Sequence, residues 1–277
     1  MDPHQYCQQK AAGSGSSFYY SFLFLPEDKR RAITALYAFC REVDDVVDEC
    51  SDAAVARMKL AWWRNELAAA FHGTPQHPVA RALAEVAPRF NLAEARLSEI
   101  IDGMQMDLDH HHYPTFDALR LYCHRVAGVV GLLSAEIFGY QDRRTLEYAA
   151  DLGLAFQLTN IIRDVGEDAR RDRIYLPLDE IERHGVSLDD IARSRETDNF
   201  RRLMEFQIER AQGYYREAFS KLPPADRRAQ RTGIIMAAIY RTVLDEIRHD
   251  GCHVLSGRVS LTPVRKLWIA CWTWVRG

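Results

Sequence analysis

The sequence predicts an all-α fold in a single domain, and three observations support this. Apolar residues recur at helical spacing along nearly the whole chain, whereas strand-like alternation bounded by turn residues is scarce. The 277 residues include only 15 Gly and 10 Pro, and 47% are hydrophobic, which indicates a compact helical core. No long linker, shift in composition or internal repeat divides the chain. One domain over residues 1–277 is therefore predicted, with 1–13 expected to be flexible.

Turn residues separate the expected helices, in chain order. Helices at 29–50 and 53–72 end at "HGTPQHP" (72–78), and helices at 78–88 and 93–107 end at "HHHYP" (110–114). A helix at 115–138 ends at "FGYQD" (138–142) and is followed by one at 142–165. After "LPLDEIERHGVS" (176–187), helices at 188–193 and 197–221 end at "KLPPAD" (221–226). The last two cover 226–249 and 262–274, and the connections are all short.

Charge and cysteine content exclude several classes of protein. Lys and Arg number 36 against 39 Asp and Glu, a net charge of -3, so no nucleic-acid partner is expected. The six cysteines form no C-x-x-C pair, which argues against a zinc knuckle or a disulfide framework and fits a cytoplasmic location. The N-terminus has no signal-peptide pattern, and no uncharged run approaches the roughly 20 residues that span a bilayer.

Two acid-rich stretches lie among apolar, helix-forming residues: "AFCREVDDVVDE" (38–49) and "LTNIIRDVGEDARRDRIYLP" (158–177). On one helix, four polar residues project from a single face at i, i+4, i+7 and i+11: Tyr37, Arg41, Asp44 and Asp48. A second helix carries a similar stripe at i, i+3, i+7 and i+11: Gln157, Asn160, Asp164 and Asp168. Like charges four residues apart destabilise a helix by roughly 0.2–0.5 kcal/mol per pair, so a cation is expected between the stripes.

The oxygen ligands of both stripes suit a hard cation. Mg²⁺ takes one or two carboxylates and completes its octahedron with water and phosphate oxygens, which points to a diphosphate substrate. In the other interpretation the acids form a solvated face and pair with nearby arginines: Arg41, Arg163, Arg170 and Arg171. Either stripe alone favours that interpretation, whereas two stripes of the same design favour the metal site.

"DDVVD" (44–48) and "DVGED" (164–168) resemble the two aspartate-rich motifs of the squalene and phytoene synthase family, the head-to-head trans-prenyltransferases. The likeness covers almost the whole chain, through "YCHRVAGVVG" (122–131) to "GRVSLTPVRKL" (257–267). Within the family, "SGSSFYYSFLFLP" and "PLDEIERHGVSLDDI" are most similar to the presqualene diphosphate synthases of hopanoid pathways. The resemblance implies an isoprenoid-synthase-type helical bundle around a central cavity.

The resemblance also implies a metal-dependent mechanism. Mg²⁺, for which Mn²⁺ could substitute, holds the diphosphate of one prenyl donor and helps it leave. The 2,3-double bond of a second prenyl diphosphate attacks the allylic cation, and loss of a proton closes a cyclopropane. Matched motif by motif, the metal ligands are Asp44, Asp48, Asn160, Asp164 and Asp168. Arg41 and Arg163 are expected to hold phosphate oxygens, because Arg presents a fork of donors.

Other site residues are implied by the same resemblance. The phosphate-binding opening segment begins at Ser14, Ser16 and Ser17, but the cation of many relatives is missing at Ser16, so Arg258 or Lys266 is expected to replace it. The spacing of Tyr122 alone indicates a residue of the hydrophobic core, whereas the resemblance implies that it takes part in the proton step. The pocket would also include Tyr37, Val126, Val130, Gln157, Tyr175 and Tyr240. Small residues such as Gly128 and Gly131 would let a prenyl chain approach the backbone.

The expected reaction joins two farnesyl diphosphates into presqualene diphosphate without NADPH, and downstream squalene-forming enzymes would be partners. Alternatives are dehydrosqualene, squalene or phytoene as product. A non-catalytic helical partner protein is also open, although the intact aspartate motifs oppose it. The "YCHRVAGVVG" block opposes a head-to-tail elongator or a terpene cyclase. The C-terminal "VRKLWIACWTWVRG" fits either a peripheral contact with the inner membrane surface or packing onto the protein body.

Overall fold

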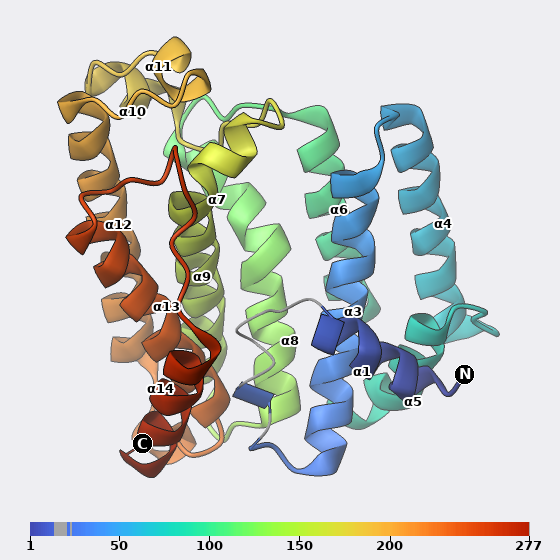
Figure 1. Ribbon diagram of the computed structural model, residues 1–277. Coiled ribbons are helices and arrows are strands. Elements are labelled where there is room, and N and C mark those ends of the chain that lie inside the picture. The colour runs from blue at the N-terminus through green and yellow to red at the C-terminus, as the bar shows by residue number, and fades with distance from the viewer. Residues whose placement is uncertain (14–20, 23, 277) are drawn as a thin grey trace.

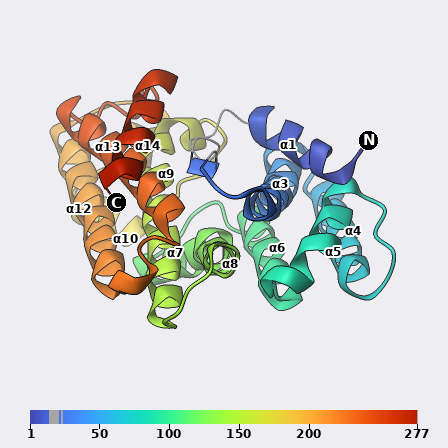
Figure 2. The same ribbon diagram turned by 90° about the horizontal axis from the view of Figure 1, so that it is seen from below.

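The computed structural model describes residues 1–13, 21–22 and 24–276, and it confirms the all-α fold. Two groups of helices stand side by side (Figures 1 and 2). The first group contains α1 (Pro3–Gly13), α3 (Glu27–Glu49), α4 (Ala53–His72), α5 (Pro78–Phe90) and α6 (Glu94–Asp109). The second contains α7 (Phe116–Cys123), the π-helical turn η1 (His124–Gly128), α8 (Val129–Phe138), α9 (Arg144–Ala169), α10 (Leu178–Arg183), α11 (Leu188–Ala192), α12 (Asp198–Lys221), η2 (Pro224–Asp226), α13 (Arg231–His249) and α14 (Pro263–Arg276).

The N-terminal segment was expected to be flexible, and the structure places residues 3–13 in a helix that packs on the protein body. α1 buries Cys7 and Ala11, and it packs against α3 and α5. Lys10 Nζ lies 2.7 Å from a carboxylate oxygen of Asp45, and the Tyr6 hydroxyl donates to Glu42 at 2.8 Å. These contacts with α3 hold a segment whose own composition is too polar to signal a buried helix.

The start of α13 is the largest boundary error, because the helix begins at Arg231 and not at 226. The buried carboxylate of Asp226 accepts hydrogen bonds from the amides of Gln141 and Asp142 and from the Thr145 hydroxyl. Those bonds fix residues 224–226 as a separate 3₁₀ turn next to the start of α9. α10 was also not predicted. The remaining helices lie close to the ranges expected from the sequence.

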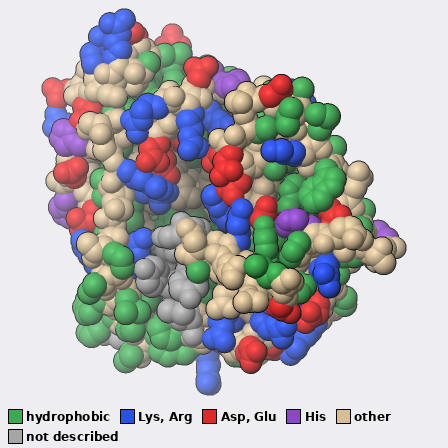
Figure 3. Space-filling model, turned by 45° about the vertical axis from the view of Figure 1, so that its right-hand side comes forward, with side chains coloured by type: hydrophobic (Ala, Val, Ile, Leu, Met, Phe, Trp, Pro, Cys, Tyr) green, Lys and Arg blue, Asp and Glu red, His purple; other side chains and the backbone are tan. Residues whose placement is uncertain are grey.

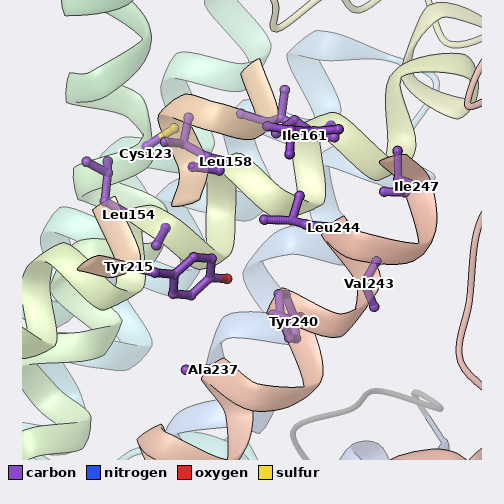
Figure 4. Close-up of a cluster of buried hydrophobic side chains, with 14 of the residues drawn as sticks. Cys123, Leu154, Leu158, Ile161, Tyr215, Ala237, Tyr240, Val243, Leu244 and Ile247 are labelled. Atoms are coloured by element: carbon purple, nitrogen blue, oxygen red, sulfur yellow. The ribbon is translucent and has the colours of Figure 1, made fainter. Parts of the chain in front are cut away.

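α9 carries the second acidic stripe, and it is held by packing against α12 and α13. Figure 4 shows side chains from these three helices pointing toward one another, including Leu158, Tyr215 and Leu244. All three are buried, and the Tyr215 hydroxyl hydrogen-bonds to that of Thr159 at 3.0 Å. Burying an aliphatic side chain of this size contributes roughly 1.5–3 kcal/mol, so α9 is firmly positioned by its neighbours.

α8 and α9 approach so closely that glycine is required where they meet. A Cβ atom on Gly131 would lie 2.1 Å from the Ala149 carbonyl oxygen, and one on Gly153 would lie 2.3 Å from the Ala127 carbonyl oxygen. Backbone atoms cannot move aside as a flexible side chain would. Gly131 also lines the pocket between the two helix groups, so the expectation that it makes room for a prenyl chain stays a prediction.

The segment from α7 to α8 forms one wall between the two groups. Its π-helical turn contains Val126, which contacts both hydrophobic clusters, and such turns are frequent at functional sites. By length and composition alone, Phe116–Phe138 is the one helical stretch of the described chain that could cross a membrane. Core helices pass the same test, and here 44% of the tested window is buried inside the protein.

Candidate active site

A pocket of about 770 Å³ lies between the two helix groups and is lined by α3, α6, α8, α9 and α13. Asp164 and Tyr148 both line it and lie sixteen residues apart on α9, which corresponds to about 24 Å along the helix. Acidic and basic side chains gather around the centre of the face in Figure 3, and others lie along its lower edge. The lining residues change from mostly charged near Asp164 to mostly apolar near Phe138.

The predicted residues of the first stripe all line this pocket from α3: Tyr37, Arg41, Asp44 and Asp48. Arg41 Nη1 lies 2.6 Å from Asp44 Oδ2, and the other terminal nitrogen of Arg41 binds Asp45. Burial and then the nearby charge of Asp48 raise the pKa of Asp44 to about 7, and Arg41 only partly offsets these effects. This carboxylate is thus short of positive partners.

The predicted residues of the second stripe also line the pocket, from α9: Gln157, Asn160, Asp164 and Asp168. Asp164 Oδ1 accepts from Arg163 Nε at 2.8 Å and lies 2.9 Å from Arg258 Nε. Burial and the charge of Asp164 raise the pKa of Asp168 to about 8. The buried Oδ1 of Asn160 has no hydrogen-bond partner in the described part of the chain.

Two arginines after α9 connect the stripes. Arg171 and Arg173 lie 3.2 Å and 2.8 Å from the two carboxylate oxygens of Asp48, which comes from α3. Arg173 also donates to the Val47 carbonyl at 3.0 Å and approaches Asp107 at 3.5 Å. The structure thus brings together acids more than one hundred residues apart in sequence.

The arginine-pairing interpretation holds in part. Arg41, Arg163 and Arg171 pair with stripe acids as that interpretation expected, whereas Arg170 donates instead to the Leu255 carbonyl at 3.3 Å. Its other half, a solvated outer face, is wrong because the acids line a pocket. Among the described residues, no three carboxylate, histidine or cysteine side chains converge closely enough to hold one ion. The arginines therefore hold carboxylates that a metal would need.

Three cations line the same end of the pocket: Arg163, Arg258 and Lys266. The pKa of Lys266 is lowered, first by burial and then by the positive charges of Arg163 and Arg258. Burial opposes the charge of Arg163, but its hydrogen bonds to Asp164 outweigh this and raise its pKa. Mutual repulsion among cations is relieved by a bound anion, so this cluster suits a phosphate group. Arg258 and Lys266, which were expected to replace the missing cation at Ser16, line the pocket, and that role stays a prediction because Ser16 lies outside the described residues.

A buried group of tyrosines lies below the acids. The rings of Tyr122 and Tyr175 stack with centroids 5.3 Å apart, and Tyr113 packs against both. The Tyr175 hydroxyl donates to Asp107 Oδ1 at 2.7 Å. Burial raises the pKa of Asp107, while Arg173 and hydrogen bonds from Tyr175 and Tyr122 lower it. Burial also raises the pKa of Tyr122 far above its ordinary value.

Asp107 was missed by the sequence analysis. It lines the pocket and is only 5% exposed. The sequence signal for a buried acid was its position between Met106 and Leu108 on α6. The adjacent polar residues Gln105 and Asp109 hid this signal, because a helix end rich in polar residues usually faces solvent.

The other predicted pocket residues are located as follows. Val126, Val130 and Tyr240 line the pocket, and the Tyr240 ring lies 5.0 Å from that of Phe156. Three predicted residues lie outside the described residues: Ser14, Ser16 and Ser17. Their assignment therefore stays a prediction.

An all-α bundle with acids, cations and an apolar interior in one central pocket has the architecture of the isoprenoid-synthase class. The family model for squalene/phytoene synthase matches residues 11–265, and the chain belongs to this family of head-to-head prenyltransferases. Phytoene synthase of Arthrospira platensis is 36% identical over 96% of this chain and 90% of that protein. The 15-cis-phytoene synthase of Synechocystis sp. is 35% identical over 99% of this chain and 85% of that protein.

Solved structures support the same assignment. A dehydrosqualene synthase in complex with ligand superposes with a TM-score of 0.86 at 29% identity, covering 99% of this chain and 96% of that one. Squalene synthase HpnC from Alicyclobacillus acidocaldarius superposes with a TM-score of 0.77 at 31% identity, covering 90% of this chain and 94% of that one. The prediction of the family and of its isoprenoid-synthase-type fold is confirmed.

Proposed function

We propose that this prenyltransferase joins two farnesyl diphosphates head to head into presqualene diphosphate and releases pyrophosphate. The observation that carries the proposal is the pocket itself. It combines acids from α3 and α9, a cluster of cations and an apolar interior, and as a whole it extends about 24 Å along α9. A diphosphate fits the charged end, and a long isoprenoid chain fits the interior.

The stripe residues fit a divalent metal by their donor chemistry. Carboxylate and amide oxygens are the ligands that Mg²⁺ and Mn²⁺ accept, and Asn160 Oδ1 is buried with no partner among the described residues. The residues proposed to hold Mg²⁺ are Asp44, Asp48, Asn160, Asp164 and Asp168. When bound, the metal supplies Lewis-acid compensation of the charge that develops on the leaving diphosphate.

The cations of the pocket have a separate task. Arg163, Arg258 and Lys266 are proposed to bind diphosphate oxygens, because they gather at the acidic end and the charges of Arg163 and Arg258 disfavour a proton on Lys266. Arg171 and Arg173 would have to release Asp48 before it becomes a ligand. Once released, their guanidinium groups face the same end of the pocket and can pair with the substrate's phosphates.

The tyrosine group is proposed to handle the carbocation and its proton. Aromatic faces attract a cation, by about 2 kcal/mol or more where water is excluded. Because burial raises the pKa of Tyr122, its hydroxyl stays protonated and can direct a hydrogen bond or relay a proton with Tyr175. Val126 and Val130 exclude water from this region, which protects the cation from hydrolysis.

Two groups of relatives favour different donors. The solved neighbours are named for dehydrosqualene and squalene, both built from C15 donors, and they favour farnesyl diphosphate. The curated relatives are named for phytoene, which is built from C20 donors, so phytoene formation from geranylgeranyl diphosphate is the second candidate. A reaction that stops at presqualene diphosphate needs no NADPH, and its product would pass to a squalene-forming enzyme.

The test is a product assay with purified protein. Farnesyl or geranylgeranyl diphosphate is supplied with Mg²⁺, with and without NADPH, and the products are identified by mass spectrometry. We expect presqualene diphosphate from farnesyl diphosphate under both conditions, and no turnover after chelation of the metal. A C30 or C40 hydrocarbon as the sole product would reject the proposed reaction, and a C40 product would support the second candidate.

A further inference from the structure

The outer face of α14 is a continuous apolar surface. Six residues at i, i+3, i+4, i+7, i+8 and i+11 are exposed and form what we call the α14 stripe: Val264, Leu267, Trp268, Cys271, Trp272 and Val275. Trp268 is 61% exposed and Trp272 is 46% exposed, and their rings stack with centroids 5.7 Å apart. Figure 1 places α14 at the lower left of the molecule, and hydrophobic side chains gather at the lower left of the space-filling view in Figure 3. Apolar patches of this kind mark interaction sites.

The opposite face of α14 already attaches the helix to the protein body. Ile269 and Ala270 are buried, and the Trp274 ring stacks on Phe24 at 4.8 Å. The Arg231 guanidinium lies 4.6 Å from the centre of the Trp274 ring. α14 is therefore held mainly by its inner face, while the stripe on its outer face is exposed and accessible to a partner outside the chain.

The charges around the stripe are basic. Residues 263–277 contain three basic residues and no acidic one, although the whole chain has a net charge of -3. Arg227 and Arg228 are exposed in the turn just before Arg231, and no described carboxylate lies within ion-pair distance of either. Arg265 does pair with Glu246. The surface beside the end of α14 is thus suited to an anionic partner.

We propose that the α14 stripe docks on an anionic lipid bilayer. Amphipathic helices with Trp and Leu on one face and Lys or Arg around it lie in the membrane interface. Tryptophan is enriched there because its ring is apolar and its N–H is polar. A second copy of this chain fits less well, because two basic helix surfaces would then face each other.

Because α14 forms part of the pocket wall, docking would bring the pocket to the lipid surface; this step rests on the proposed function. Lys266 on the inner side of α14 lines the pocket, as do Val259, Ser260 and Leu261 from the segment just before the helix. The stripe faces away from the pocket on the outer side of the same helix. Docking would therefore place a pocket wall against the lipid, where the apolar C30 chain of the product can enter the bilayer without crossing water.

The experiment is a vesicle flotation assay with the full chain. Vesicles of pure phosphatidylcholine are compared with vesicles in which about a third of the lipid is phosphatidylglycerol. We expect binding to the anionic vesicles, weaker binding at high salt, and a loss of at least tenfold for Trp268→Ser/Trp272→Ser. We expect Arg227→Gln/Arg228→Gln to lose mainly the dependence on anionic lipid.

A matched control exists on the far side of the molecule. Met58 and Trp62 on α4 are 64% and 45% exposed, so Met58→Ser/Trp62→Ser removes similar apolar surface away from α14. This variant is expected to bind like the parent. Circular dichroism shows whether each variant is folded, and Asp164→Ala, which removes turnover under the proposed function, is expected to bind normally.

Three outcomes would overturn the proposal. The first is a folded parent protein that does not float with anionic vesicles at low salt. The second is equal loss of binding in the α4 and α14 variants. The third is a parent dimer that the α14 variant converts to a monomer, with vesicle binding unchanged. Because flotation needs no substrate, failure of the docking and failure of the proposed reaction are distinguished.

Discussion

Asp107→Asn is expected to reduce turnover without weakening the fold. Asp107 is 5% exposed, accepts the Tyr175 hydroxyl at 2.7 Å and lies 3.5 Å from Arg173. Asparagine keeps the shape and an acceptor oxygen but removes the negative charge. The Tyr122 and Tyr175 hydroxyls would then lose the charged group that orients them. Asp107 is thus a positioning residue for the tyrosines.

The expected loss of turnover is calculated from the hydrogen bonds that Asp107 accepts from the Tyr175 and Tyr122 hydroxyls. A hydrogen bond to a charged group contributes about 1.5–3 kcal/mol, against about 0.5–1.5 kcal/mol for a neutral one. Losing the charge in both contacts therefore weakens the arrangement by about 2–3 kcal/mol, which corresponds to a roughly 30- to 150-fold loss of kcat. KM is expected to change little, because the diphosphate is bound by other residues.

The folded state of Asp107→Asn is expected to be as stable as that of the parent or slightly more stable, although its turnover falls. Burial raises the pKa of Asp107, which means that the folded protein disfavours the charge. Replacing it by a neutral group should leave the melting temperature unchanged or raise it slightly. A fall in kcat with an unchanged melting temperature would therefore separate a functional role from a purely structural one.

The assay is steady-state turnover of farnesyl diphosphate, with thermal unfolding measured on the same samples. Asp109→Asn is the matched control, because Asp109 lies two residues away and forms an exposed ion pair with Arg57 at 2.8 Å. Exposed pairs contribute about 0–1 kcal/mol, so this variant should behave like the parent. A folded Asp107→Asn protein with kcat within threefold of the parent would refute the role of Asp107.

Asp48→Ala or Asp164→Ala is expected to abolish turnover with nearly unchanged circular dichroism, and retained activity in both would contradict their role. Burial raises the pKa of Asp44 to about 7 and of Asp168 to about 8, so the folded protein holds protons that the unfolded chain has lost above pH 3.8. Its metal-free melting temperature should therefore fall as pH rises toward 8, and Mg²⁺ should restore it; a flat profile would count against this. Tyr148 lines the end of the pocket away from Asp164, where a longer prenyl chain would reach. Tyr148→Ala should therefore raise kcat/KM for the C20 donor relative to the C15 donor by about tenfold or more, measured by competition between the two donors.

The helices and both stripes could be predicted because their signals are local. The spacing of Arg41, Asp44 and Asp48 fixes one face of a helix, and the structure places that face on the pocket. The same holds for Asp164 and Asp168 on α9. Period and spacing determine which side chains share a face, and the oxygen ligands on two such faces are the basis of the proposed metal site.

The parts that could not be predicted depend on contacts between distant residues. Arg173 lies 125 residues from Asp48, and nothing in the local sequence indicates that it binds there. α1 is a further example, because its polar sequence becomes a packed helix only through α3 and α5. The close approach of Gly131 to the backbone of Ala149 could not be predicted for the same reason, since Ala149 lies on another helix.

The arginines on Asp48 offset part of the negative charge of the acidic pocket. Burial, and after it repulsion by a neighbouring acid, raises the pKa values of Asp44 and Asp168. Arg171 and Arg173 reduce this repulsion from a turn that directly follows α9. Because that turn is stabilised by its own backbone hydrogen bonds to residues 168 and 169, the guanidinium groups can move while the stripes stay fixed. A metal and a diphosphate entering together would then exchange one set of ion pairs for another, which keeps the charge of the pocket balanced throughout.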